Sequence, residues 1–166
     1  MATKKGVVIT VMILAAITAA SFLVWLIPQN IETEIIISDF GIHLDNVKEI
    51  HSTLNNGINE EFQNMLDKKI TPQEYINLAE ISSSQVNSQI IQLVESKAPE
   101  EWHESYLNYM ESLKIFNSQI RESIIVATLI DEDKQTTNEF TDIIKKIDSL
   151  KKDTESFAQA SDETRP

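Results

Sequence analysis

A run of 22 residues without a charged side chain, from Gly6 to Ile27, constrains this 166-residue chain more than any other feature. At about 1.5 Å per residue, a helix over this run is roughly 33 Å long, which is enough to cross the hydrocarbon core of a bilayer. Its only polar side chains are Thr10, Thr18 and Ser21, whose hydroxyls can bond to carbonyls of the same helix. We therefore predict that residues 6–27 form a transmembrane anchor.

The charges that flank the run predict its orientation. Lys4 and Lys5 precede it, whereas acidic residues, beginning with Glu32, follow it. Because Lys and Arg concentrate on the cytoplasmic side of membrane spans, the bias predicts that residues 1–5 form a cytoplasmic stub and that the chain after Pro28 lies outside. We expect a single-pass protein of the cell membrane.

Two alternatives to an uncleaved anchor exist. Small residues at 18–20 suit a signal peptidase, but the apolar run continues past them to Ile27, which favours the anchor. The segment Lys4-Lys5-Gly6 resembles the processing site of type IV prepilins, which implies a filament subunit cut after Gly6. Val11 stands where that family typically carries a glutamate, so the anchor is favoured over this alternative as well.

Two pairs of alanines inside the run have the small-xxx-small spacing that lets membrane helices approach closely. They are Ala15 with Ala19 and Ala16 with Ala20. We take these four as candidate helix-packing residues, with ordinary apolar filler as the alternative.

The charge balance excludes several classes of function. The chain has 26 acidic and 14 basic residues, a net charge of −12, which argues against nucleic acid as a partner. Without Lys4 and Lys5, the part beyond the span has 12 basic and 26 acidic residues and a net charge of −14. The absence of cysteine excludes disulfides, thiolate metal sites and thiol nucleophiles.

Beyond the anchor, apolar residues recur at spacings of three and four, which indicates helices. We expect four helices over residues 33–67, 72–97, 99–131 and 136–159. The sequence Thr71-Pro72-Gln73-Glu74 has a capping threonine, a proline at the first helical position and a glutamate three residues after the cap.

Short connections between long helices force neighbours to run antiparallel. The sequence therefore predicts an all-α protein, with the transmembrane helix followed by an acidic, extracytoplasmic, antiparallel four-helix bundle over residues 28–160. The polar tail, residues 161–166, is expected to be disordered.

No motif in the chain indicates catalysis. There is no G-x-S-x-G sequence, and Ser82-Ser83-Ser84 falls in the middle of an expected helix, where hydroxyls bond to the previous turn or face solvent. We expect a protein that is not an enzyme, with no catalytic residue and no cofactor.

Two pairs of residues are weak candidates for a metal site. Asp39 and His43 are four residues apart and could hold a divalent cation on a helix surface. Glu100 and His103 have the Glu-x-x-His spacing of ferritin-like bundles, but the chain lacks the second such motif that those sites need. His51 lies on the apolar stripe of the first expected helix, where a hydrogen-bonded residue at the edge of the core is expected.

The third expected helix carries an aromatic stripe. Trp102, Tyr106, Tyr109 and Phe116 are spaced as in a helical stripe, and this spacing favours bundle core over a cofactor pocket.

The opening of that helix, Pro99-Glu100-Glu101-Trp102 followed by Tyr106, resembles small membrane-anchored helical-bundle proteins of archaeal and bacterial envelopes that have no assigned activity. This resemblance implies no catalytic residues. The layout also resembles the periplasmic four-helix sensor domains of chemoreceptors. Those domains return through a second span to a cytoplasmic signalling rod, and this sequence has no second apolar run of sufficient length.

These patterns predict a non-enzymatic interaction module on the outer side of the membrane, as an accessory subunit of a membrane complex. Its expected partners are the lipid bilayer and at least one other protein. The alternatives are a bundle that binds a cation or small ligand, and the pilin-like filament subunit.

Overall fold

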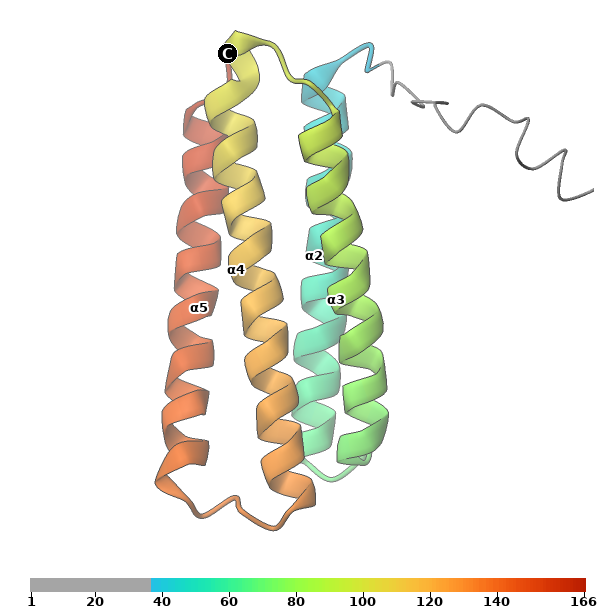
Figure 1. Ribbon diagram of the computed structural model, residues 1–166, viewed down its shortest axis with the longest axis vertical. Coiled ribbons are helices and arrows are strands. Elements are labelled where there is room, and N and C mark those ends of the chain that lie inside the picture. The colour runs from blue at the N-terminus through green and yellow to red at the C-terminus, as the bar shows by residue number, and fades with distance from the viewer. Residues whose placement is uncertain (1–36) are drawn as a thin grey trace, which may run out of the picture. The chain divides into compact units, whose positions relative to one another are not determined.

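The computed structural model describes residues 37–166, which contain four α-helices and no strand (Figure 1). The helices are α2 (Phe40–Leu66), α3 (Pro72–Glu95), α4 (Glu100–Asp131) and α5 (Asn138–Glu163). Each helix runs opposite to the one before it, so the predicted all-α, antiparallel four-helix bundle is confirmed for this part of the chain.

The predicted anchor, residues 6–27, lies outside the described residues, as do the stub of residues 1–5 and the four alanines of the proposed packing face. Among residues 37–166, no helix has the length and apolar character needed to cross a bilayer.

Side-chain caps determine where three of the helices begin. Thr71 Oγ1 accepts from the Glu74 amide at 3.2 Å, and the Glu74 carboxylate accepts from the Thr71 amide at 2.8 Å, so the predicted capping box is confirmed. Thr137 caps α5 in the same manner, by accepting from the amide of Phe140. These bonds satisfy amides that have no partner within the helix.

The helix expected over residues 33–67 begins later than its pattern predicts. Asp39 has extended backbone, with φ −146° and ψ 110°, and its Oδ1 accepts from the Ile42 amide at 3.0 Å. The prediction was wrong for residues 37–39, because Asp39 is the N-cap and its side chain binds a first-turn amide, so that the helix begins at Phe40.

The prediction of a disordered tail over residues 161–166 was also wrong. Helix α5 continues to Glu163, and Ser161 is fully buried. Arg165 donates to the carbonyl oxygen of Gly41 at 3.2 Å and to Asp45 Oδ1 at 2.6 Å. These contacts tie the end of the chain to the start of α2.

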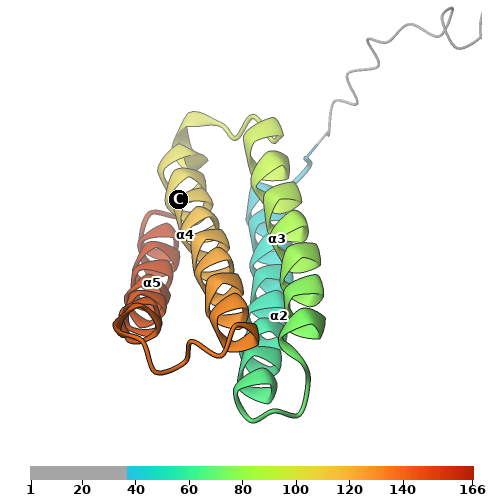
Figure 2. The same ribbon diagram turned by 60° about the horizontal axis from the view of Figure 1, so that its bottom comes forward.

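Helix α4 lies at the centre of the packing, between α5 and the α2–α3 pair (Figure 1, Figure 2). Tyr106, Tyr109 and Phe116 of its aromatic stripe are buried, and Trp102 is half-buried at one end. The interpretation of this stripe as bundle core is therefore confirmed.

The closest helix pair is α4 with α5, and small side chains allow it. Ser105 Oγ donates to the carbonyl oxygen of Ser161 at 2.7 Å, and Ser112 Oγ donates to that of Thr154 at 2.9 Å. Ser105 and Ser112 are seven residues apart on α4, and Thr154 and Ser161 are seven residues apart on α5. This is the heptad spacing of two packed helices. A short hydroxyl side chain can reach the backbone of the facing helix only where the two helices lie close together.

Polar side chains also join α3 to α4. Tyr75 Oη donates to Ser123 Oγ at 2.6 Å, and Ser83 Oγ donates to Asn117 Oδ1 at 2.6 Å. The side-chain Nδ2 of Asn117 in turn donates to Asn87 Oδ1 at 2.8 Å. These bonds fix the register between the two helices.

Helix α2 is held in a different way. Its backbone lies against α3 and α4 but makes no close approach to α5. Long side chains bridge that distance, since Lys48 pairs with Asp162 at 2.5 Å and Asp45 pairs with Arg165. The fourth side of the bundle is therefore joined by side-chain tips rather than by packed backbones.

Candidate functional site

The structure gives the first pair of metal candidates other roles. Asp39 caps α2, and His43 stacks on Tyr106 with ring centroids 5.9 Å apart. The second pair, Glu100 and His103, lies exposed on the first turn of α4. Within residues 37–166, no three histidine, aspartate or glutamate side chains are placed to hold a metal ion together.

A short chain of hydrogen bonds determines which ring nitrogen of His43 carries the proton. The Tyr106 hydroxyl donates to the carbonyl oxygen of Phe40 at 2.9 Å, and its oxygen lies 2.9 Å from His43 Nδ1. Because the hydroxyl proton is already used, we assign the proton on His43 to Nδ1, from which it is donated to Tyr106. Burial lowers the pKa of His43, so the neutral form is favoured.

His51 is buried in the core, 7 % exposed, as the sequence predicts. Its Nδ1 lies 2.8 Å from the Tyr109 hydroxyl, and its ring centroid is 4.6 Å from that of Phe116. Nε2 of His51 has no hydrogen-bond partner. Burial lowers the pKa of His51 to about 4, so the imidazole is neutral at pH 7.

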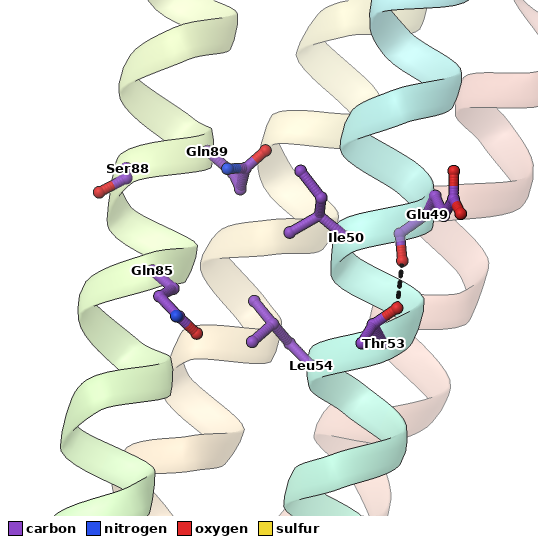
Figure 3. A pocket seen from close by; sticks show the side chains of 7 residues that line it. All are labelled: Glu49, Ile50, Thr53, Leu54, Gln85, Ser88 and Gln89. Atoms are coloured by element: carbon purple, nitrogen blue, oxygen red, sulfur yellow. Dashed lines mark hydrogen bonds between the residues drawn. The ribbon is translucent and has the colours of Figure 1, made fainter.

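A groove of about 530 Å³ lies between α2 and α3 and is called here the α2–α3 groove (Figure 3). Ile50 and Leu54 project from α2 towards α3, and Gln85 and Gln89 project from α3 towards α2. Its complete lining is Glu49, Ile50, Thr53, Leu54, Gln85, Ser88 and Gln89. The side chains between the two helices are thus two aliphatic groups and two carboxamides.

Gln89 is the unusual member of this lining. Its side chain is 7 % exposed and extends into the groove, yet Oε1 has no hydrogen-bond partner (Figure 3). Leaving a buried acceptor unpaired costs about 1–3 kcal/mol, and most buried polar groups avoid it. Because Oε1 is itself buried, a donor from outside the bundle would satisfy it only after the carboxamide turns about its terminal torsion.

The hydroxyl groups of the lining are already engaged. Thr53 Oγ1 donates to the carbonyl oxygen of Glu49 at 3.0 Å, and Ser88 Oγ donates to that of Ser84 at 3.1 Å. Glu49 is the one ionisable side chain of the lining. This set of groups suits binding, because it combines apolar surface with amides and offers no paired nucleophile and base.

The two helices that form the groove are acidic. Helix α3 contains three glutamates and neither lysine nor arginine. The only basic residue of α2 is Lys48, which pairs with Asp162 of α5, whereas its acidic residues are Asp45, Glu49, Glu60 and Glu61. Lys48 is therefore the only lysine or arginine of α2 and α3, and its ion-pair partner is a carboxylate of α5.

Sequence reasoning missed this groove. One signal was present, because Ile50 and Ile81 do not belong to the apolar stripes that form the core. They are 42 % and 59 % exposed. An aliphatic residue off the stripe indicates an apolar surface, but only the structure shows which of these residues line a groove.

A comparison of the chain with protein-family models, with curated proteins and with solved structures found no match. The chemistry of the groove lining is therefore the guide to function.

Proposed function

We propose that this protein is a non-enzymatic, membrane-anchored interaction module, whose helical bundle binds another protein outside the cytoplasm as an accessory subunit of a membrane complex. The apolar run over residues 6–27 supports the anchor, and the lysines before it support the orientation. The observation that carries the binding role is the α2–α3 groove, which is lined by the exposed Ile50, the partly buried Leu54 and Gln89, whose Oε1 has no hydrogen-bond partner.

The test is purification of the full chain from native membranes in a mild detergent, followed by mass spectrometry of the native-size complex. We expect a protein partner at fixed stoichiometry. Ile50→Lys places a charge in the groove and should abolish co-purification of that partner. Ile91→Lys is the matched control, because Ile91 is a similarly exposed isoleucine of α3 outside the groove lining.

Recovery of the chain only as a monomer or homodimer would overturn the proposal. The volume of the groove favours a second candidate, a small-ligand site, because about 530 Å³ falls within the range of small-molecule pockets. A bundle of that kind would show no protein partner, and its thermal midpoint would rise with ligand concentration according to RT ln(1 + [L]/Kd).

A further inference from the structure

We propose that the occupant of the α2–α3 groove is a basic amphipathic helix of the partner protein, with aliphatic residues towards the groove and lysine or arginine residues along its edges. This inference rests on the proposed function and specifies the chemistry of the partner.

The apolar surface of the groove is extended along the two helices. The rings of Phe62 and Tyr75 lie with centroids 5.5 Å apart, which sets the antiparallel register of α2 and α3. In that register, Gly57 of α2 is level with the exposed Ile81 of α3, about one turn beyond Leu54 and Gln85 of the lining. An elongated strip of aliphatic groups suits a helix that presents side chains at intervals of three and four residues.

Gly57 leaves room for such a helix. A Cβ atom at this position would have no heavy atom within 4 Å, so nothing within the described residues requires a glycine here. Glycine in the middle of a helix is less favourable than alanine. The missing side chain flattens the surface of α2 next to Ile81, which lets the backbone of another helix approach.

Gln89 specifies a donor. The amides in the middle of a docked helix are already bonded to their own carbonyls, so the partner of Gln89 Oε1 must come from a side chain. Lysine and arginine carry three and five N–H donors on long stems, and the terminal torsion of glutamine is broad enough to turn Oε1 towards them.

Charge favours a basic partner over a second copy of this chain. Residues 37–166 have 12 basic and 24 acidic side chains, a net charge of −12. Two copies would therefore repel each other, whereas a basic helix is attracted to the carboxylates of Glu49, Glu60 and Glu61.

The experiment measures binding of a fluorescent peptide, LKKLLKLLKKLLKL, to the full chain in zwitterionic nanodiscs by fluorescence anisotropy. Empty nanodiscs are the blank, and a chain that does not enter nanodiscs is titrated in solution. The counterpart peptide has glutamate in place of every lysine. We expect the lysine peptide to bind more weakly as salt rises and the glutamate peptide not to bind.

Variants assign the binding to the groove. Ile50→Lys should raise the Kd about tenfold or more, since each factor of ten corresponds to about 1.4 kcal/mol, while Ile91→Lys changes it less than about twofold. Gln89→Leu should weaken binding without lowering the thermal midpoint, because it removes a buried acceptor that has no partner. A merely structural glutamine would lower that midpoint when replaced.

Three results would overturn the inference. They are binding of both peptides alike, equal effects of Ile50→Lys and Ile91→Lys, and a loss from Asp142→Asn on α5 as large as that from Glu49→Gln. The last would mean that the peptide responds to total charge only. A native partner that still co-purifies with Ile50→Lys would refute the groove as its site but leave the accessory-subunit proposal standing, whereas the absence of any partner would refute that proposal itself.

Discussion

Two glycines of α2 have opposite surroundings. A Cβ atom on Gly41 would lie 3.2 Å from Asp39 Oδ1 and 3.3 Å from Cη2 of Trp102, whereas one on Gly57 would meet nothing within 4 Å. Gly41 lets Trp102 cover the first turn of α2, and the carbonyl of the same glycine accepts from Arg165. The two positions therefore separate the helix propensity of alanine from the effect of crowding.

Gly57→Ala should raise the free energy of unfolding by about 0.5–1 kcal/mol, because alanine loses less backbone entropy in a helix. Gly41→Ala should raise the free energy of unfolding less, or lower it, because the indole of Trp102 or the carboxylate of Asp39 must shift. Urea unfolding at pH 7 measures both. If Gly41→Ala raised the free energy of unfolding as much as Gly57→Ala, the contacts around Gly41 would not restrict the side chain at that position.

His51 links stability to pH. Burial lowers its pKa from 6.5 to about 4, so between these values the unfolded chain binds a proton that the folded chain does not. The free energy of unfolding therefore keeps the full contribution of the neutral His51 above pH 6.5 and loses it as the pH falls towards 4. The full shift corresponds to about 3 kcal/mol.

His51→Phe should therefore reduce the difference in unfolding free energy between pH 7 and about pH 4.5 by about 2–3 kcal/mol. The substitution also removes the hydrogen bond to Tyr109, but that loss is common to both pH values and cancels. Urea titrations at the two pH values measure the effect, with His103→Gln, at an exposed histidine, as the control. An unchanged difference in His51→Phe would show that His51 does not govern the acid sensitivity.

At the scale of elements, the α4–α5 seam depends on side chains that are small as well as polar. Ser112 is fully buried and bonds to the backbone of Thr154, so it leaves no room for a longer side chain. Ser118 is an exposed serine of the same helix, bonded to the carbonyl oxygen of Lys114 in the preceding turn.

Ser112→Leu should lower the free energy of unfolding by about 1–3 kcal/mol, because overpacking forces the two helices apart. Ser118→Leu should change it by less than about 0.5 kcal/mol, as is typical of surface substitutions. Chemical denaturation of both variants measures the difference. Equal tolerance at the two positions would contradict the close packing of α4 and α5.

Local signals made much of this fold predictable. The bonds at Thr71 and Glu74 form between neighbours in the chain, and the stripe through Tyr109 and Phe116 follows from the period of a helix. Polarity misled the prediction at Ser161, because its burial depends on Ser105, which is 56 residues away in the chain. A hydroxyl group looks the same in a sequence whether it faces water or a neighbouring backbone.

The candidate site was less predictable than the fold. The spacing of Asp39 and His43 predicts a metal site. In the structure Asp39 instead caps α2, and His43 is hydrogen-bonded to Tyr106 of α4. Gln89 carries no signal in sequence, since its significance comes from the absence of a partner for one buried atom. Pair spacing finds sites within one helix, whereas the α2–α3 groove arises between two.

At the scale of the whole molecule, Arg165 joins three helices. It donates to Gly41 and Asp45 of α2, lies 5.7 Å from the centre of the Trp102 ring of α4, and stands two residues after the end of α5. Since the backbones of α2 and α5 do not approach each other, this side chain supplies part of the missing contact.

Arg165→Ala should lower the free energy of unfolding by about 1–2 kcal/mol, from the lost ion pair and the cation–π contact. Arg121→Ala, at an exposed arginine of α4, is the matched control and should have little effect. Urea unfolding at low and high salt measures both, and the loss in Arg165→Ala should shrink at high salt. No difference between the two variants would show that the contacts of Arg165 do not stabilise the bundle.

An even number of alternating helices returns the polypeptide to its starting end, so the first residue of α2 and the last of α5 lie at the same end of the bundle (Figure 1). A domain fused after Pro166 would therefore begin at the end of the bundle where α2 starts, whereas the turns at 67–71 and 132–137 lie at the opposite end (Figure 1). Along α2, Ile50 and Leu54 of the groove lie about 15–20 Å from Phe40, the first residue of the helix, at about 1.5 Å per residue.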